Sequence, residues 1–152
     1  MRIAPDDPLA ADVRALLEEH LADMRRISPP ESVHALDPEL LAAPAVRFLA
    51  ARDDDGTLLG CGALTSLGGG DAELKSMRTA PAARGRGVAA AVLVELIRHA
   101  RERGDRRVLL ETGTEPFFEA AARLYLRHGF TPCEPFGDYA LDPHSRYFAL
   151  AL

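Results

Sequence analysis

Several features that mark particular classes of protein are missing from this chain of 152 residues. It has two cysteines, far fewer than a disulfide-held scaffold contains. No apolar stretch approaches the roughly 18–20 residues of a membrane-spanning helix, and the N-terminus lacks the apolar core of a signal peptide. We therefore expect a cytoplasmic protein without a membrane partner, in which Cys61 and Cys133 are buried free thiols.

The chain also lacks an excess of basic residues, internal repeats and linkers. Its 18 Lys and Arg against 23 Asp and Glu give a net charge of −5, which argues against general nucleic-acid binding. The five histidines show no H-x-x-x-H or Cys/His spacing, so no metal site is predicted. With 47% hydrophobic residues, the length is typical of one domain over residues 1–152.

Proline and apolar spacing predict two helices in the N-terminal third. Apolar residues recur at helical spacing over residues 8–26, with Asp7 as the expected N-cap and Pro8 at the first helical position. Asp37 followed by proline repeats this signal and predicts a short second helix.

Apolar runs between glycine-rich turns predict the strands. Residues 53–56 and 68–71 are hairpin turns, so the strands around them should form an antiparallel meander. A helix over residues 87–103, ended by Gly104, leads to a buried strand that we expect to be parallel to the last strand of the meander. The predicted strands cover residues 2–4, 46–52, 57–66, 72–79, 107–111, 130–133 and 147–152.

One more helix completes the pattern. Thr114 is expected to cap a helix over residues 115–128, which Gly129 ends. The resulting fold class is α/β, with a mixed central sheet made of an antiparallel meander plus a βαβ crossover, flanked by helices.

The most informative segment is the turn Arg84-Gly85-Arg86-Gly87, directly before the helix at residue 87. A helix N-terminus leaves backbone N–H groups unpaired and carries partial positive charge, so it binds phosphate well. Glycines let an anion approach the main chain, and the two arginines add permanent cations. The alternative is a basic surface turn without a ligand.

Two phosphate-binding motifs fit this turn poorly. A P-loop would need Lys-Ser or Lys-Thr after the glycines, which is absent. Gly85, Gly87 and Ala90 do match the dinucleotide spacing G-x-G-x-x-A, with Glu111 ending the next strand. Against it, a loop containing Pro81 separates the strand from the first glycine, and only one βαβ unit is visible. A nicotinamide-dependent oxidoreductase domain stays a disfavoured alternative.

The pattern Arg84-x-x-Gly87-x-Ala89 closely resembles the acyl-CoA pyrophosphate motif Q/R-x-x-G-x-G/A of the GNAT acetyltransferase superfamily. A second segment, from Ala121 to Phe130, is similar to the family signature A-x-x-x-Y-x-x-x-G-F, and the order of elements matches over nearly the whole chain. Phe118 departs from the pattern, because many members carry Asn at this place and a contact to the cofactor is then absent here.

The resemblance implies an acyl-CoA-dependent N-acetyltransferase that uses acetyl-CoA. The N–H groups of the turn would bind the pyrophosphate, and the main chain of residues 77–79 would pair with the pantetheine arm at a place where the sheet splays open. An N–H near Met77 would face the thioester oxygen. The implied cofactor-binding residues are Met77, Arg78, Thr79, Arg84, Gly85, Arg86, Gly87, Val88 and Ala89.

Two residues are candidates for proton transfer. Tyr125 belongs to the family signature and could protonate the leaving thiolate, because a phenol with a pKa near 10 keeps its proton at neutral pH. Its alternative role is that of a core aromatic. Glu73 stands where several family members carry a base, and could instead form a simple ion pair with Lys75 on the same face of the strand.

The family builds its acceptor site from the segment between the first two helices and from the closing strands. Here these segments and Glu73 offer carboxylates for a cationic amine, so a small amine or amino-acid-like acceptor is expected, attacked directly in a ternary complex. Homodimers are frequent in the family, which favours a homodimer here. A non-catalytic acyl-CoA-binding module remains the other alternative. The candidate acceptor residues are Met24, Ser28, Glu31, Lys75, Asp138 and Tyr139.

Overall fold

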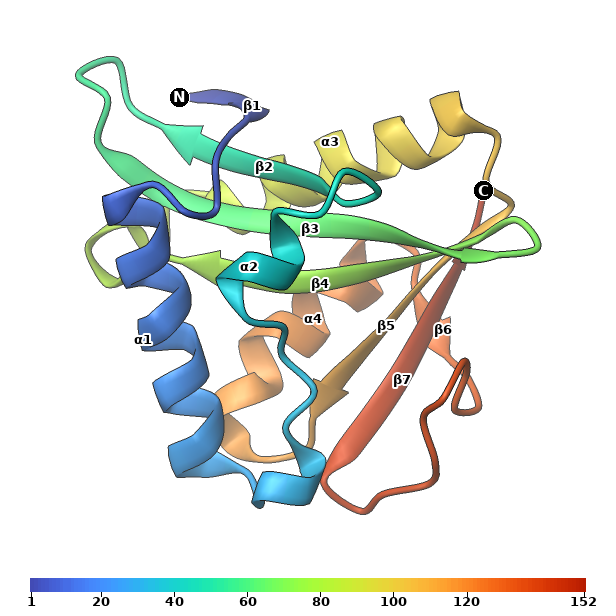
Figure 1. Ribbon diagram of the computed structural model, residues 1–152. Coiled ribbons are helices and arrows are strands. Elements are labelled where there is room, and N and C mark those ends of the chain that lie inside the picture. Colours follow the sequence, from blue (N-terminus) through green and yellow to red (C-terminus); the bar gives the residue numbers. More distant parts are fainter.

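The computed structural model describes all residues, 1–152, and contains a single seven-stranded sheet with the strand order β1-β2-β3-β4-β5-β7-β6 (Figure 1). The strands are β1 (Arg2–Pro5), β2 (Arg47–Arg52), β3 (Leu58–Gly68), β4 (Asp71–Thr79), β5 (Arg107–Gly113), β6 (Thr131–Pro132) and β7 (Ser145–Ala151). The α-helices are α1 (Ala11–Ile27), α2 (Pro38–Leu41), α3 (Val88–Arg103) and α4 (Glu119–Arg127), and three short 3-10 turns cover Pro30–Ser32, Pro81–Ala83 and Pro116–Phe118.

The sheet is mixed, as the sequence predicts. β1 to β4 are antiparallel neighbours, β4 and β5 are parallel, and β5, β7 and β6 are again antiparallel. The helix α3 makes the single βαβ crossover between β4 and β5. One crossover is too few for the doubly wound fold of a dinucleotide-binding domain, so this alternative fails at the level of topology.

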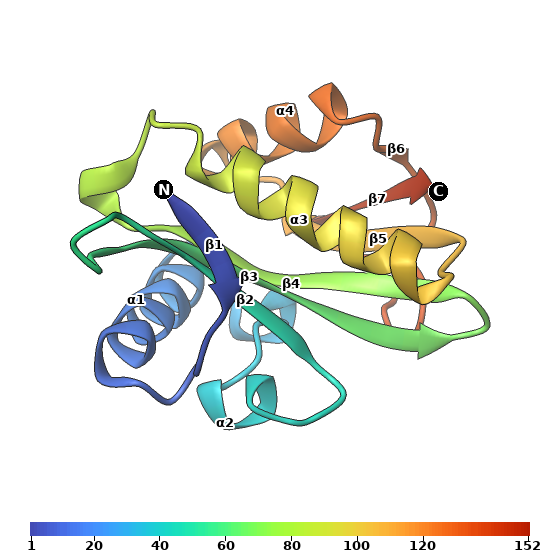
Figure 2. The same ribbon diagram turned by 90° about the horizontal axis from the view of Figure 1, so that it is seen from above.

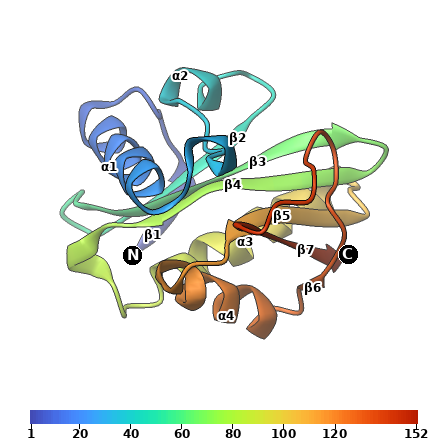
Figure 3. The same ribbon diagram turned by 90° about the horizontal axis from the view of Figure 1, so that it is seen from below.

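Helices cover both faces of the sheet. α1 and α2 lie on one face and α3 and α4 on the other (Figures 2 and 3). The larger core lies under α3 and α4, and the smaller one lies under α1 and α2. Cys61 is buried in the smaller core, whereas Cys133 is partly exposed, which corrects the expectation that both thiols are buried. None of the helices is both long and apolar enough to cross a membrane.

Two helix starts differ from the prediction, in each case because the expected capping side chain has another partner. The helix α1 begins at Ala11 and not at residue 8, because the Asp7 carboxylate accepts the Leu9 N–H at 2.9 Å and holds a turn ahead of the helix. Thr114 donates its hydroxyl to the carbonyl of Pro143 at 3.0 Å, so it is no cap. A 3-10 turn follows it, and α4 begins only at Glu119.

β4 carries an irregularity that shapes the site. Ser76 has a φ of 55°, and together with Met77 it lies opposite the single residue Gly62 of β3, which is the geometry of a β-bulge. β4 and β5 separate just before this bulge. Their parallel pairing is restricted to the stretch between Asp71 and Glu73, and Figure 1 shows the two strands diverging from there. The sheet is therefore split open at its centre, as the family resemblance implies.

Candidate active site

A cleft of about 640 Å³ lies where β4 and β5 separate. It is lined by the C-terminal halves of both strands, by the end of α1 and the loop after it, by the start of α3, and by α4. Because it lies in the opening of the sheet, residues from the α1 face and from the α3/α4 face border the same space. Residues that are distant in sequence can therefore act on one ligand.

The glycine-rich turn forms one end of this cleft. Gly85 and Gly87 have φ angles of 79° and 77°, in the left-handed region that favours glycine, and a Cβ added at either would meet no atom within 4 Å. The N–H groups of residues 85–90 donate no backbone hydrogen bond, so the start of α3 presents a row of free donors. A row of this kind suits a phosphate group.

The two arginines of the turn differ in position. Arg84 lines the cleft, together with the two glycines, Val88 and Ala89. Arg86 lies outside it and pairs with Asp53 in the β2–β3 turn, with nitrogen–oxygen distances of 3.1 and 3.3 Å. The structure therefore places one guanidinium of the turn at the cleft, where the sequence predicts two.

The main chain of β4 forms the next part of the wall. Met77, Arg78 and Thr79 line the cleft, and beyond Glu73 the edge of β4 that faces β5 has no strand partner. The Arg78 side chain is buried against α1, where it pairs with Glu19 and lies 2.8 Å from Asp23. Its guanidinium is thus held by α1.

A cluster of polar side chains occupies the α1 face of the opening. Glu73 is buried, and its Oε2 accepts a hydrogen bond of 2.5 Å from the Tyr139 hydroxyl. Lys75 Nζ lies 3.5 Å from the same oxygen, 2.9 Å from the Tyr139 hydroxyl and 3.1 Å from the carbonyl of His34. The predicted Glu73–Lys75 pair is therefore present. It belongs to a larger cluster that also binds the loop after α1, through His34, and the β6–β7 loop, through Tyr139.

Glu111 on β5 is the second carboxylate of the cleft, and sequence reasoning missed it as a site residue. It accepts a hydrogen bond of 3.2 Å from the Ser145 hydroxyl. Burial raises the pKa of Glu111 to about 7; Ser145 and Lys75 oppose this increase and Glu73 adds to it. The available signal was a lone glutamate at the end of the apolar run Val108–Leu110.

Tyr125 lies on the opposite face of the sheet from Glu111. It is buried with the α3/α4 core, where its ring packs edge-on against Phe130 with a centroid distance of 5.7 Å. The residue also lines the cleft. Burial, and to a lesser degree Glu111, raises the pKa of Tyr125, so the phenol keeps its proton at neutral pH.

The predicted acceptor residues divide into two groups. Met24, Ser28, Lys75 and Tyr139 line the cleft. Glu31 and Asp138 are exposed and lie outside it, since the loops carrying them turn these side chains to the surface. Sequence reasoning could identify the two loops but not which residues in them face inward.

A histidine of α1 is a further polar residue of the cleft wall. The Nδ1 atom of His20 is buried without a partner, and the residue lines the cleft next to Arg78. Burial, helped by the Arg78 charge, lowers the pKa of His20 to about 4, so its ring is neutral at pH 7. It adds a polar but uncharged group to the wall.

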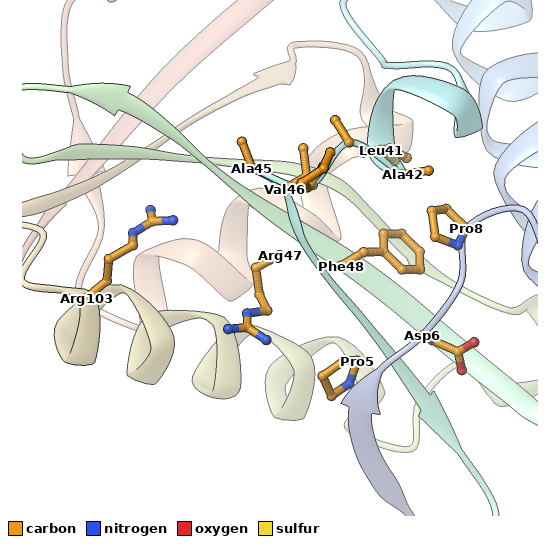
Figure 4. Close-up of a pocket in the computed structure, with 12 residues that line it drawn as sticks. Pro5, Asp6, Pro8, Leu41, Ala42, Ala45, Val46, Arg47, Phe48 and Arg103 are labelled. Atoms are coloured by element: carbon orange, nitrogen blue, oxygen red, sulfur yellow. The ribbon is translucent and has the colours of Figure 1, made fainter.

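A second hollow, of about 370 Å³, lies near β1 and β2, away from these residues (Figure 4). Arg47 and Arg103 lie toward one end of it, and Phe48 and Pro8 toward the other. It contains neither the glycine-rich turn nor Glu73 and Glu111, so the cleft at the sheet opening is the candidate active site.

The family model for the acetyltransferase (GNAT) family matches residues 13–130, which include both the glycine-rich turn and the Tyr125 segment. The chain belongs to the GNAT family. It is an N-acetyltransferase by this membership. The expectation drawn from the two sequence motifs is thereby confirmed, and so is the fold class.

Three curated relatives of this GNAT chain are similar over 94% or more of their own length. An uncharacterised N-acetyltransferase of Escherichia coli K12, YedL, is 47% identical over 99% of this chain and 94% of its own length. The uncharacterised N-acetyltransferase YsnE of Bacillus subtilis is 45% identical over 100% of both chains. An IAA acetyltransferase of Azospirillum brasilense is 40% identical over 95% of this chain and 94% of its own.

Solved structures share the fold. A crystal structure from Klebsiella pneumoniae, provisionally assigned as an acyl-CoA N-acyltransferase, has a TM-score of 0.81 at 29% identity and covers 99% of this GNAT chain and 97% of its own. An aminoglycoside 6'-N-acetyltransferase complexed with coenzyme A has a TM-score of 0.69 at 17% identity, over 99% and 97% of the two chains, and therefore shows likeness of fold alone.

Proposed function

We propose that this enzyme transfers the acetyl group of acetyl-CoA to a primary amine of a small molecule, an amine or an amino-acid-like compound, in a ternary complex. The observation that carries the proposal is the shared cleft. The free N–H groups before α3, the carboxylates of the α1 face and the Tyr125 hydroxyl all border one opening in the sheet.

The residues at the turn fit the pyrophosphate of acetyl-CoA. The main chain of residues 85–89 would donate to its oxygens, and Arg84 would add the positive charge. The free edge of β4 at residues 77–79 would pair with the amides of the pantetheine arm, as an added strand pairs with a sheet edge. Acetyl-CoA supplies an activated acyl group as a thioester.

The bulge of β4 supports a role for the main chain at Met77. A β-bulge re-aims the backbone, and this one lies where the pantetheine arm would end. We assign the Met77 N–H to the thioester oxygen, where it would stabilise the oxyanion that forms on attack.

The environments of the two thiols support direct attack by the amine, without an acetylated cysteine as an intermediate. Burial raises the pKa of Cys61 to about 12, so it stays protonated and is a poor nucleophile, and Cys133 lies outside the cleft. Neither cysteine is placed to carry an acetyl group between the two substrates, which supports a ternary complex.

Tyr125 is the proposed general acid. The thiolate of CoA would form on the α3/α4 face, in apolar surroundings that raise thiol pKa values, as burial does at Cys61. Because such a thiolate is strongly basic, the phenol of Tyr125 can give it a proton despite its own raised pKa.

The test measures CoA thiol release from acetyl-CoA with a panel of amines, amino acids and peptides. With the best acceptor, Tyr125→Phe should lower kcat by about 10–100-fold and leave the KM for acetyl-CoA nearly unchanged, because the lost proton transfer acts in the transition state. Glu134→Gln is the control variant, since Glu134 is exposed and does not line the cleft. An unchanged kcat for Tyr125→Phe would refute the acid role.

The same assay separates the enzyme from a non-catalytic acyl-CoA-binding module. Such a module would bind acetyl-CoA in calorimetry, and no amine in the panel would release the thiol.

We further propose that the protein is a cytoplasmic homodimer without nucleic-acid or membrane partners. Light scattering on the purified chain should give twice its mass of 16.4 kDa.

A further inference from the structure

We propose that Glu111, and not Glu73, accepts the proton of the acceptor's ammonium group, and that Glu73 is a positioning residue that holds Lys75 and Tyr139. This inference rests on the proposed function, because it concerns the amine side of the same cleft. It reverses the assignment that sequence position alone favours.

Glu73 is already engaged. Its Oε2 accepts the Tyr139 hydroxyl at 2.5 Å and faces Lys75 Nζ at 3.5 Å. Taking up a proton there would neutralise Glu73, weaken both contacts and leave a buried ammonium without its only charged carboxylate partner. Lys75 also donates to the carbonyl of His34 and to the Tyr139 hydroxyl. By holding Lys75, Glu73 therefore fixes the contacts between β4 and the two loops that carry His34 and Tyr139.

Glu111 is free to act. Glu73 and Glu111 are the two carboxylates that line the cleft, and no cation lies within ion-pair distance of Glu111. The charges of Glu73 and Lys75 cancel, so Glu111 supplies the negative charge that attracts an ammonium group into the cleft. Its one hydrogen bond comes from the Ser145 hydroxyl and leaves lone pairs available.

The position of Glu111 suits proton transfer across the sheet opening. On β5, Val108 and Leu110 face the core that contains Tyr125, so Glu111 faces the other side by strand alternation. An amine held by Glu111 and a thiolate near Tyr125 would therefore lie on opposite sides of the thioester carbon, which separates the incoming from the leaving group.

The surroundings of Glu111 tune it as a base. Burial raises its pKa to about 7, which is closer to the pKa of an amine, near 10.4, than an ordinary carboxylate would be. The charged and titratable groups near it are Glu73 and Lys75 on β4, Tyr139 and Asp142 in the β6–β7 loop and Tyr147 on β7, with Tyr125 of α4 across the sheet.

Glu111 takes one proton from R–NH3⁺, and the nitrogen lone pair of R–NH2 forms a bond to the thioester carbon. Collapse of the tetrahedral species breaks the C–S bond, and the sulfur receives the proton of Tyr125. The nitrogen then loses its second proton to solvent, Tyr125 regains a proton from solvent, and Glu111 releases its proton to solvent, so that one proton is released per turnover.

The experiment compares the pH dependence of kcat/KM for the best amine of the panel in the wild type, Glu111→Gln and Glu73→Gln. We expect a rising limb near pH 7 in the wild type. Glu111→Gln should remove this limb and lower kcat/KM about 100-fold at pH 7.5. Glu73→Gln should lower the rate and keep the limb, moved to lower pH, because the Glu73 charge raises the pKa of Glu111 and Lys75 lowers it. Glu134→Gln, at an exposed site outside the cleft, is the matched control.

Outcomes on either side are decisive. A limb that survives in Glu111→Gln and disappears in Glu73→Gln would overturn the assignment. Should a variant fold poorly, NMR of the uniformly 13C,15N-labelled wild type gives a second answer. The Glu111 carboxyl carbon, assigned through its backbone correlations, should titrate near pH 7, and titration near 4.5 would refute the proposal.

Failure of the proposed function looks different. If no amine releases CoA thiol from the wild type, the transferase itself is refuted. If the wild type is active and Tyr125→Phe is impaired, but Glu111→Gln behaves as the wild type, then the function stands and only the role of Glu111 falls.

Discussion

At the scale of single residues, Gly62 shows how closely the site depends on packing behind it. A Cβ built at Gly62 would lie 2.4 Å from Met77 Sδ and 3.0 Å from side-chain carbons of Leu96 and Val92. The bulge at Ser76 turns the Met77 side chain over β3, so the residue opposite must have no side chain.

We expect Gly62→Ala to displace Met77 and with it the main chain that faces the thioester. Overpacking of this kind costs about 1–3 kcal/mol of stability, and kcat should fall with it. Urea unfolding and CoA release would measure the two effects. In the double variant Gly62→Ala, Met77→Ala, most of the stability loss should be recovered, and strictly additive losses would contradict the packing explanation.

At the scale of elements, the turn before α3 places Arg84 at the cleft and Arg86 outside it, although the two look equivalent in sequence. Arg84→Ala should raise the KM for acetyl-CoA about 10-fold or more, because a charge-assisted hydrogen bond to phosphate is worth about 1.5–3 kcal/mol. Arg86→Ala, the matched control, should change it less than about 3-fold, since Arg86 pairs with Asp53. Steady-state kinetics and calorimetry with CoA would check this, and equal effects at both positions would contradict it.

The order of the elements could be predicted from periodicity and turn residues, because these signals are local. The hairpin turns and the left-handed Gly104 lie where the sequence predicts them, and α3 runs from Val88 to Arg103. The errors at Asp7 and Thr114 came from side chains whose actual partners, the Leu9 N–H and the Pro143 carbonyl, belong to a local turn and a remote loop.

The candidate site was predictable only in the parts that are continuous in sequence. The turn at residues 84–89 and the Tyr125 segment are local motifs. The cluster of Glu73, Lys75 and Tyr139 joins positions that are 66 residues apart at their extremes, and nothing in one sequence places them together. Glu111 was overlooked because its strand reads as buried, and buried strands seldom carry an unpaired charge.

At the scale of the whole molecule, the opening of the sheet links all of these features. Parallel pairing that ends at Glu73, and a bulge three residues later, let β4 and β5 diverge, so that both faces reach one cleft. Lys75 then ties the loops of the α1 face to β4. This organisation requires an uncompensated carboxylate, Glu111, to be partly buried within the fold.

That requirement lowers stability in a pH-dependent way. The pKa of Glu111 is raised to about 7 in the folded protein from 4.5, so the folded state holds a proton that the unfolded state releases. Stability is therefore lost as pH rises from about 4.5 to about 7, and stays reduced above that. Each pKa unit corresponds to about 1.4 kcal/mol, so the full cost is about 1–3 kcal/mol after allowing for partial exposure.

We therefore expect Glu111→Gln to stabilise the protein while it impairs catalysis, since the amide has no charge to bury. The gain in the free energy of unfolding should be about 1–2 kcal/mol larger at pH 8 than at pH 5, as measured by urea unfolding at both values. Glu134→Gln should show no such difference, because its carboxylate is exposed. A gain that is the same at both pH values would mean that Glu111 is ionised throughout, and that the fold holds its charge without cost.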